Sequence, residues 1–124
     1  MLLDLSDLIG KPYKSHGRGP DAYDCYGLDM EVAKRLGHKV PDLFKELKKG
    51  DPRDSEYVAA SEGLIKTDTP KFGDIVVFLN RRGRIYHCGI VLNQGDFIHC
   101  DEDGVNIKKL YLYPKKGEYY TWQK

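Results

Sequence analysis

The stretch Arg84–Cys100, RIYHCGIVLNQGDFIHC, decides the fold, because it holds two apolar runs separated by a short turn signal. Residues 84–92 and 96–100 are rich in the β-branched and aromatic types that favour strands. Asn93-Gln94-Gly95 between them is typical of a hairpin loop. The stretch therefore predicts two antiparallel strands joined by a tight connection.

The length of that connection decides which side chains share a face. A two-residue loop, Gln94-Gly95, would pair Asn93 with Asp96. A three-residue loop, with Gly95 in the left-handed conformation, would instead pair Leu92 with Asp96. The choice matters because a shift of one residue turns every side chain of a strand to the other face.

The three-residue loop gives the hairpin one consistently apolar face, built from Cys88, Ile90, Leu92, Ile98 and Cys100. It places His87 diagonally beside His99 on the opposite face, and it sets Asp101 opposite His87. The two-residue loop would put the cysteine and isoleucines of one strand on a face with His99. We therefore expect the three-residue loop and two neighbouring imidazoles. The group that orients His87 is expected to be His99, with Asp101 as the alternative.

The rest of the chain predicts helices first and strands afterwards, which is an α+β layout. The expected helices cover 4–9, 25–36, 41–50 and 54–63, and the further expected strands cover 74–79, 105–111 and 119–122. The polar, turn-forming stretch over 14–21 is expected to be an exposed loop.

The second of these helices carries a cysteine on its first turn. Leu28, Val32 and Leu36 recur every four residues and define its apolar face. Asp24 is a natural N-cap, because its carboxylate can accept hydrogen bonds from the free N–H groups of that turn. Cys25 would then lie where the helix macrodipole stabilises a thiolate.

Composition limits what kind of protein this is. The 124 residues are 40% hydrophobic and 31% charged, which is typical of a single globular domain over 1–124. A formal net charge of +1 provides no strong field for nucleic acid or an anionic membrane. Apolar runs stay far below the about 18 residues of a membrane span, and the first residues do not resemble a signal peptide. We expect synthesis in the cytoplasm and no membrane insertion.

A thiol at a helix start and two imidazoles on one sheet face suggest a nucleophile, a base and an orienting group. The orienting group would fix the tautomer of the base through its second nitrogen. Two other interpretations stay open at this point. One is a set of structural residues without catalysis, and the other is a zinc site made of Cys25, His87 and His99 with His16 as fourth ligand. The three cysteines lack the CxxC spacing of a structural zinc site.

Three segments resemble, in order, motifs of the NlpC-type cell-wall cysteine peptidases. They are Tyr23-Asp24-Cys25-Tyr26-Gly27-Leu28, preceded by Pro12-Tyr13 and Gly17; then residues 72–78, FGDIVVF; then residues 87–92 and 97–100. The resemblance implies a papain-like core in which N-terminal helices pack on a small antiparallel sheet. It also implies that Cys25 is the nucleophile, His87 the general base and His99 the orienting residue, with the Tyr13 hydroxyl helping to hold the oxyanion.

The same resemblance implies a substrate class: amide bonds in the stem peptides of peptidoglycan, hydrolysed without a cofactor or a metal. Two departures concern the cleft, since Tyr26 replaces the usual Ser and Ser15-His16-Gly17 replaces Trp-Gly-Gly. The Cys-Tyr-Gly segment is similar to NlpC-like domains of tailed-phage tail assembly proteins. That likeness implies phage tail proteins as partners and a location in the virion or at the cell wall. A non-catalytic module of a tail tip is the alternative function.

Overall fold

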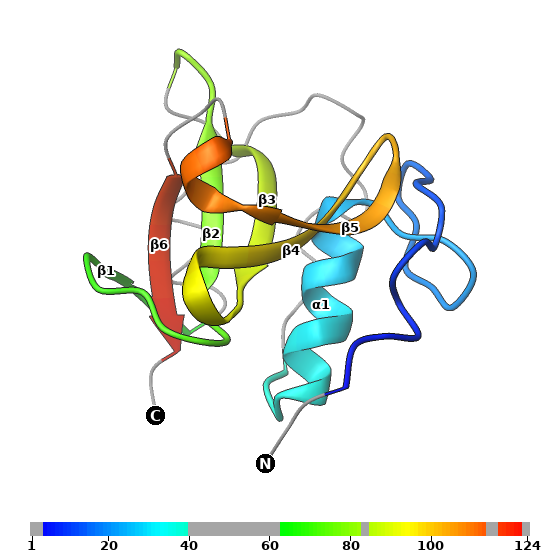
Figure 1. Cartoon of the computed structure of the whole chain (residues 1–124), viewed down its shortest axis with the longest axis horizontal. Helices are drawn as coiled ribbons and strands as arrows, with labels where there is room; N and C mark the ends of the chain where they lie inside the picture. The colour runs from blue at the N-terminus through cyan, green and yellow to red at the C-terminus, as the bar shows by residue number, and fades with distance from the viewer. Residues whose placement is uncertain (1–3, 40–62, 83–84, 114–116, 123–124) are drawn as a thin grey trace.

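The computed structural model describes residues 4–39, 63–82, 85–113 and 117–122 (Figure 1). Within these residues the chain forms one helix and six strands: α1 (Cys25–Arg35), β1 (Leu64–Thr67), β2 (Ile75–Leu79), β3 (Ile85–Val91), β4 (Asp96–Asp101), β5 (Gly104–Lys109) and β6 (Gly117–Trp122). Two short 3₁₀ turns, η1 (Asn93–Gly95) and η2 (Leu110–Leu112), complete the set. The strands form one antiparallel sheet in the order β1-β6-β2-β3-β4-β5. The α+β class is therefore confirmed.

The prediction of several N-terminal helices was wrong for the part of the chain that the structure describes. α1 forms as expected, but in place of the helix over 4–9 the chain forms turns over residues 6–10, with the Leu8 N–H donating to the Leu5 carbonyl at 3.0 Å. So short a segment cannot repay the cost of nucleating a helix, and Gly10 at φ 89° then reverses the chain. The helices expected over 41–50 and 54–63 lie outside the described residues, apart from Gly63, which is in a turn.

β1 was missing from the prediction. It is a four-residue edge strand in which Leu64 is buried and the next two residues are exposed, so it carries little of an alternating pattern. It pairs with β6, which also pairs with β2, so the last described strand lies inside the sheet (Figure 1). The strand expected over 105–111 ends at Lys109, and η2 begins at the next residue, Leu110.

The β3–β4 hairpin has the expected register. Gly95 has a φ of 78°, and the Leu92 N–H donates to the Asp96 carbonyl at 2.7 Å. The paired residues are Ile90 with Ile98 and Val91 with Phe97. The ladder covers these two pairs, and β4 and β5 then run across the direction of β2, β3 and β6 (Figure 1).

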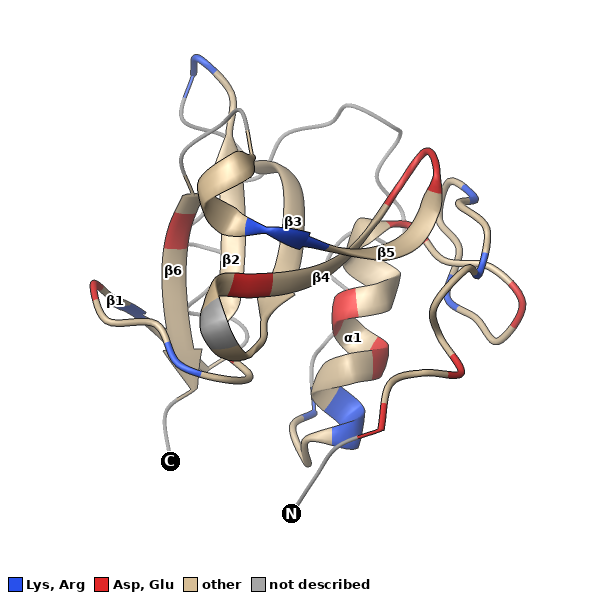
Figure 2. Cartoon of the chain, viewed as in Figure 1, with Lys and Arg blue, Asp and Glu red and all other residues tan. Residues whose placement is uncertain are grey.

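Each face of the sheet has its own apolar core. The core on the α1 side includes Leu28, Val32, Cys88, Ile90, Ile98 and Cys100. The core on the opposite side is Val76, Phe78, Val91 and Phe97, with Tyr113 packed against it. Charged residues of both signs are interspersed over the loops and exposed strands (Figure 2). In the described ranges no helix has the length and apolar character needed to cross a membrane.

Candidate active site

Cys25 is the first residue of α1, and the Asp24 carboxylate holds that helix start in place. Asp24 Oδ1 accepts the Gly27 N–H at 2.7 Å, which confirms the predicted N-cap. Its Oδ2 accepts the His16 N–H at 3.1 Å, and the Arg18 guanidinium donates to Oδ1 at 2.9 Å. One carboxylate thus ties the preceding loop to the turn that carries the thiol.

The same loop lies directly on α1 at Gly27. The Asp24 N–H donates to the Gly17 carbonyl at 3.2 Å, and a Cβ added at Gly27 would overlap that carbonyl oxygen. Any side chain at Gly27 would therefore push the loop away from the helix start. This close approach explains the glycine two positions after Cys25.

Among the three thiols, Cys25 is the one whose thiolate the surroundings stabilise. A hydrogen bond from the Cys88 thiol, and then a hydrogen bond and the positive charge of His87, lower the pKa of Cys25 to about 5, although burial opposes ionisation. That same hydrogen bond, with burial, raises the pKa of Cys88 well above its usual value. Burial, followed by the charge of Cys25, raises the pKa of Cys100 to about 12. At neutral pH, Cys25 is the thiolate and the other two thiols keep their protons.

His87 and His99 are joined by one hydrogen bond. His87 Nε2 lies 2.7 Å from His99 Nδ1, and the His99 side chain is fully buried. Burial and the neighbouring His87 charge lower the pKa of His99 to about 4, so its ring is neutral at neutral pH. Asp101 Oδ2 faces His99 Nε2 at 3.7 Å. The place beside the His87 ring therefore belongs to His99 rather than to Asp101.

Gly89 leaves room for the two rings to meet. A Cβ there would lie 2.8 Å from the Ile98 carbonyl oxygen and 2.9 Å from the Phe97 ring. Both distances are shorter than ordinary contacts between such atoms. A side chain at Gly89 would thus separate β3 from β4 where His87 and His99 approach each other.

Aromatic rings hold the orientation of His87. Tyr113 stacks on it with ring centroids 6.1 Å apart and planes 12° apart, and Phe78 lies against it at 5.8 Å and 21°. No sequence pattern separates Tyr113 from the other tyrosines of the chain, so its contact with His87 was missed. The contact arises because η2 turns the chain back over the sheet after β5.

Tyr13 belongs to the segment that lies beside the residues just before α1. It is held beside Tyr23 by a parallel bridge, in which the Lys14 N–H donates to the Tyr23 carbonyl at 3.0 Å. Burial, and then the negative charge of Cys25, raise the pKa of Tyr13. Its hydroxyl therefore keeps its proton and can donate. His16 is exposed, with a φ of 62°, and contributes its backbone N–H to Asp24.

The zinc interpretation finds no support in the geometry. In the described part of the chain, no group of three or more His, Cys, Asp or Glu side chains is placed to hold a metal ion. Zinc–nitrogen bonds of about 2.1 Å would require the two imidazole nitrogens to be more than about 3 Å apart. The 2.7 Å between His87 and His99 is instead a hydrogen-bond distance.

Known proteins resemble the chain in both sequence and fold. It is 28% identical over 110 residues to "Probable peptidoglycan endopeptidase LytE" of Bacillus subtilis, covering 89% of this chain and 29% of that protein. It is 30% identical over 103 residues to "Probable endopeptidase p60" of Listeria welshimeri, covering 83% of this chain and 17% of that protein. It is 26% identical over 106 residues to "Gamma-D-glutamyl-L-lysine dipeptidyl-peptidase" of Bacillus subtilis, covering 84% and 32%. The chain therefore spans about a third or less of each of these relatives.

Solved structures share the fold. The NlpC/p60 domain of the peptidoglycan hydrolase SagA has a TM-score of 0.61 at 22% identity, covering 91% of this chain and 89% of that one. NlpC2 from Trichomonas vaginalis has a TM-score of 0.65 at 24% identity, covering 94% and 43%. These names carry no support for an association with phage tails. The model of the NlpC/P60 family matches residues 10–122, and the chain belongs to that family.

Proposed function

We propose that the chain is a cysteine peptidase that hydrolyses amide bonds in peptidoglycan stem peptides, with Cys25 as nucleophile, His87 as general acid and base, and His99 as orienting residue. The observation that carries the proposal is the position of His87, whose Nε2 lies 2.7 Å from Nδ1 of the neutral His99 ring and whose hydrogen bond and charge lower the pKa of Cys25. Such an arrangement is what a thiol nucleophile needs. Relatives named as peptidoglycan endopeptidases support the substrate class.

The chemistry would proceed in two halves. The Cys25 thiolate attacks the amide carbon, and the oxyanion is stabilised by the Tyr13 hydroxyl and by the backbone N–H of Cys25, one of the N–H groups that a helix start leaves free. As the C–N bond breaks, His87 gives its proton to the leaving amine. Water then attacks the thioester while His87 takes its proton, which releases the acid and restores the thiolate.

A relative named for a γ-D-glutamyl-L-lysine bond makes the amide bond after D-γ-glutamate the first one to test. The cell wall would be the place of action, because the substrate is there. The alternative function, a non-catalytic module that keeps the peptidase fold, predicts the same fold without turnover. The peptidase would cleave stem peptides, whereas the non-catalytic module would leave them intact.

Mass analysis of fragments released from purified peptidoglycan tests the proposal. Wild type and His38→Gln should release peptides with a new amine terminus, because His38 stacks on Trp122 with ring centroids 4.0 Å apart, outside the cluster around Cys25. Cys25→Ala and His87→Gln should release none while keeping the wild-type circular dichroism. Equal release by Cys25→Ala would overturn the thiol mechanism. A folded wild type that releases nothing would favour the non-catalytic module.

A further inference from the structure

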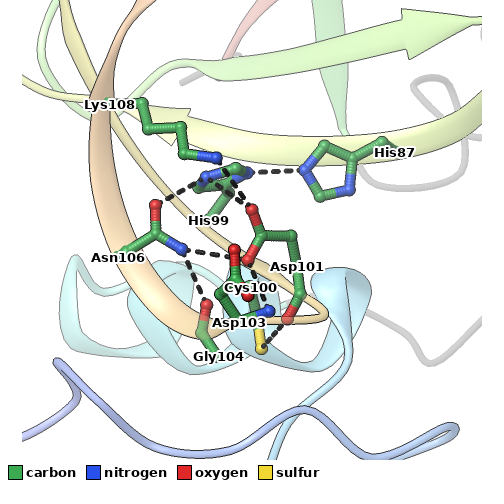
Figure 3. A network of polar contacts seen from close by, with 8 residues as sticks. All are labelled: His87, His99, Cys100, Asp101, Asp103, Gly104, Asn106 and Lys108. Atoms are coloured by element: carbon green, nitrogen blue, oxygen red, sulfur yellow. Dashed lines mark hydrogen bonds and ion pairs between the residues drawn. The ribbon is translucent and has the colours of Figure 1, made fainter.

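The polar network around the two imidazoles continues beyond them to β5 (Figure 3). Asn106 lies directly opposite His99 in the β4–β5 register. Its Oδ1 is 3.0 Å from His99 Nε2, the nitrogen that does not face His87. The amide is thus the partner of the second nitrogen of the orienting imidazole.

The orientation of this amide is determined by its other two contacts. Asn106 Nδ2 donates to Asp101 Oδ1 at 3.1 Å and to the Gly104 carbonyl at 2.9 Å. Both partners are acceptors, so the NH₂ group must face them and the amide oxygen must face His99. A flipped amide would place its oxygen against a carboxylate and a carbonyl.

The direction of each hydrogen bond then follows along the chain of groups. Because Asn106 Oδ1 can only accept, His99 Nε2 carries the proton. In the neutral ring, His99 Nδ1 is then a lone pair, which accepts the proton on His87 Nε2. The remaining nitrogen of His87, Nδ1, is the one left to exchange a proton with Cys25.

We infer that Asn106 is a positioning residue that fixes where the protons lie on His99 and His87, and so leaves His87 Nδ1 to serve the Cys25 thiol. The inference deepens the proposed function and rests on it for its meaning in catalysis. The proton positions themselves can be measured without any turnover.

A neutral amide is suited to this position for an electrostatic reason. Asp101 already faces His99 Nε2 at 3.7 Å, and its charge is shared with Lys108 Nζ at 3.0 Å and with Asn106. A carboxylate bonded directly to His99 would favour the imidazolium, which has no lone pair to offer His87. The charged or titratable groups that face the His99 ring are His87, Asp101 and Lys108. The Tyr113 ring also lies edge-on to it, with ring centroids 5.9 Å apart.

Two variants separate positioning from simple support of the β4–β5 hairpin. Asn106→Leu removes the acceptor, whereas Asn106→Asp keeps an acceptor and adds a charge. Both lose the NH₂ bonds to Asp101 and Gly104. Asn106→Asp also sets a carboxylate against Asp101, so a purely structural loss in this variant would grow as the pH rises, whereas the positioning role predicts that its kcat rises with pH. The same substitution at Asn80, in the turn after β2, is the matched control.

The experiment combines ¹⁵N NMR of the histidine rings with steady-state cleavage of stem peptides. In the wild type at pH 7, His99 should be neutral with its proton on Nε2. Asn106→Leu should lose that single tautomer and lower kcat by about 10- to 100-fold with KM little changed. Asn106→Asp should regain kcat at high pH and lose it as His99 becomes protonated, at a higher pH than in the wild type.

A wild-type His99 that carries its proton on Nδ1 would overturn the inference. So would an Asn106→Leu variant whose His99 tautomer and kcat equal those of the wild type and of Asn80→Leu, or an Asn106→Asp variant that falls in parallel with Asn106→Leu at every pH. If Asn106→Leu does not fold, Asn106→Asp carries both readouts. Correct tautomers in a wild type without turnover would refute the proposed function and leave the proton order intact.

Discussion

A hydrogen bond from the Cys88 thiol is the largest cause of the lowered pKa of Cys25, ahead of the hydrogen bond and charge of His87, and the same bond raises the pKa of Cys88. Cys88 and His87 are consecutive on β3, and regular alternation would send them to opposite faces. Both nevertheless lower the pKa of Cys25. The β3–β4 ladder is limited to the two pairs at Ile90 and Val91, and α1 packs against both strands beside it.

Thiol alkylation should distinguish Cys25 from the other two cysteines. With the pKa of Cys25 lowered to about 5 and that of Cys100 raised to about 12, iodoacetamide at pH 6 should modify Cys25 alone. The rate should fall as the pH drops through about 5, because the thiolate becomes protonated. Peptide mapping by mass spectrometry gives the site and the rate. Labelling of Cys100 at the same rate in the folded protein would contradict this.

The hydrogen bond from Cys88 makes a second, independent prediction. Cys88→Ala removes the donor and should move the pH midpoint of Cys25 alkylation upward, since that bond is the largest cause of the lowered pKa. Cys88→Ser is the matched control, because its hydroxyl still donates. The midpoints for Cys88→Ser and wild type should lie close together, and equal midpoints for Cys88→Ala and wild type would refute the assignment.

Tyr13→Phe should slow turnover without changing the nucleophile. If the hydroxyl stabilises the oxyanion, its loss should lower kcat by roughly 10²-fold, as removal of one such donor does. The alkylation rate of Cys25 at pH 6 should stay at the wild-type value, because the thiolate depends on Cys88 and His87. A parallel loss of alkylation would show instead that Tyr13 acts on the thiol.

The loop-length argument was sufficient to predict the central feature of the site. Gly95 allows the left-handed turn that pairs Leu92 with Asp96, and this register brings His87 and His99 together. The N-cap at Asp24 was predicted in the same way, from a local hydrogen-bond need. Local backbone geometry was enough for each of these features.

The features that were missed depend on how whole elements cross. Tyr113 stacks on His87 because η2 turns back over the sheet, and the effect of Cys88 on the pKa of Cys25 depends on where α1 meets β3. The position of Asn106 opposite His99, in contrast, could have been predicted from the sequence. Asp101 pairs with Gly104 across a two-residue turn, and the same counting sets Asn106 opposite His99.

Gly27→Ala should destabilise the helix start. The added methyl group would overlap the Gly17 carbonyl, so the loop must shift, at a cost of about 1–3 kcal/mol in the free energy of unfolding. Lys34→Ala, at an exposed position of α1, is the control and should change stability little. Urea unfolding followed by circular dichroism measures both variants, and equal midpoints would mean that the loop is free to move.

Burial of a neutral His99 should make stability depend on pH. Its pKa is lowered to about 4 in the folded protein, from an unfolded value of about 6.5, so the unfolded chain binds one more proton between these values. The free energy of unfolding should therefore fall by up to about 3 kcal/mol as the pH drops from 7 to 4. Urea titrations at half-unit pH steps measure this slope.

His99→Gln supplies the comparison that isolates this effect, because the variant has no group at that position that titrates in the range. It should be less stable than wild type at pH 7, where it leaves a buried cluster imperfectly bonded, but its stability should decline less as the pH falls. The difference between the two slopes belongs to His99, since the other histidines are common to both proteins. Parallel curves would mean that the folded protein accepts a proton on His99 near its usual pKa, and the neutral acceptor that His87 requires would then be missing at mildly acidic pH.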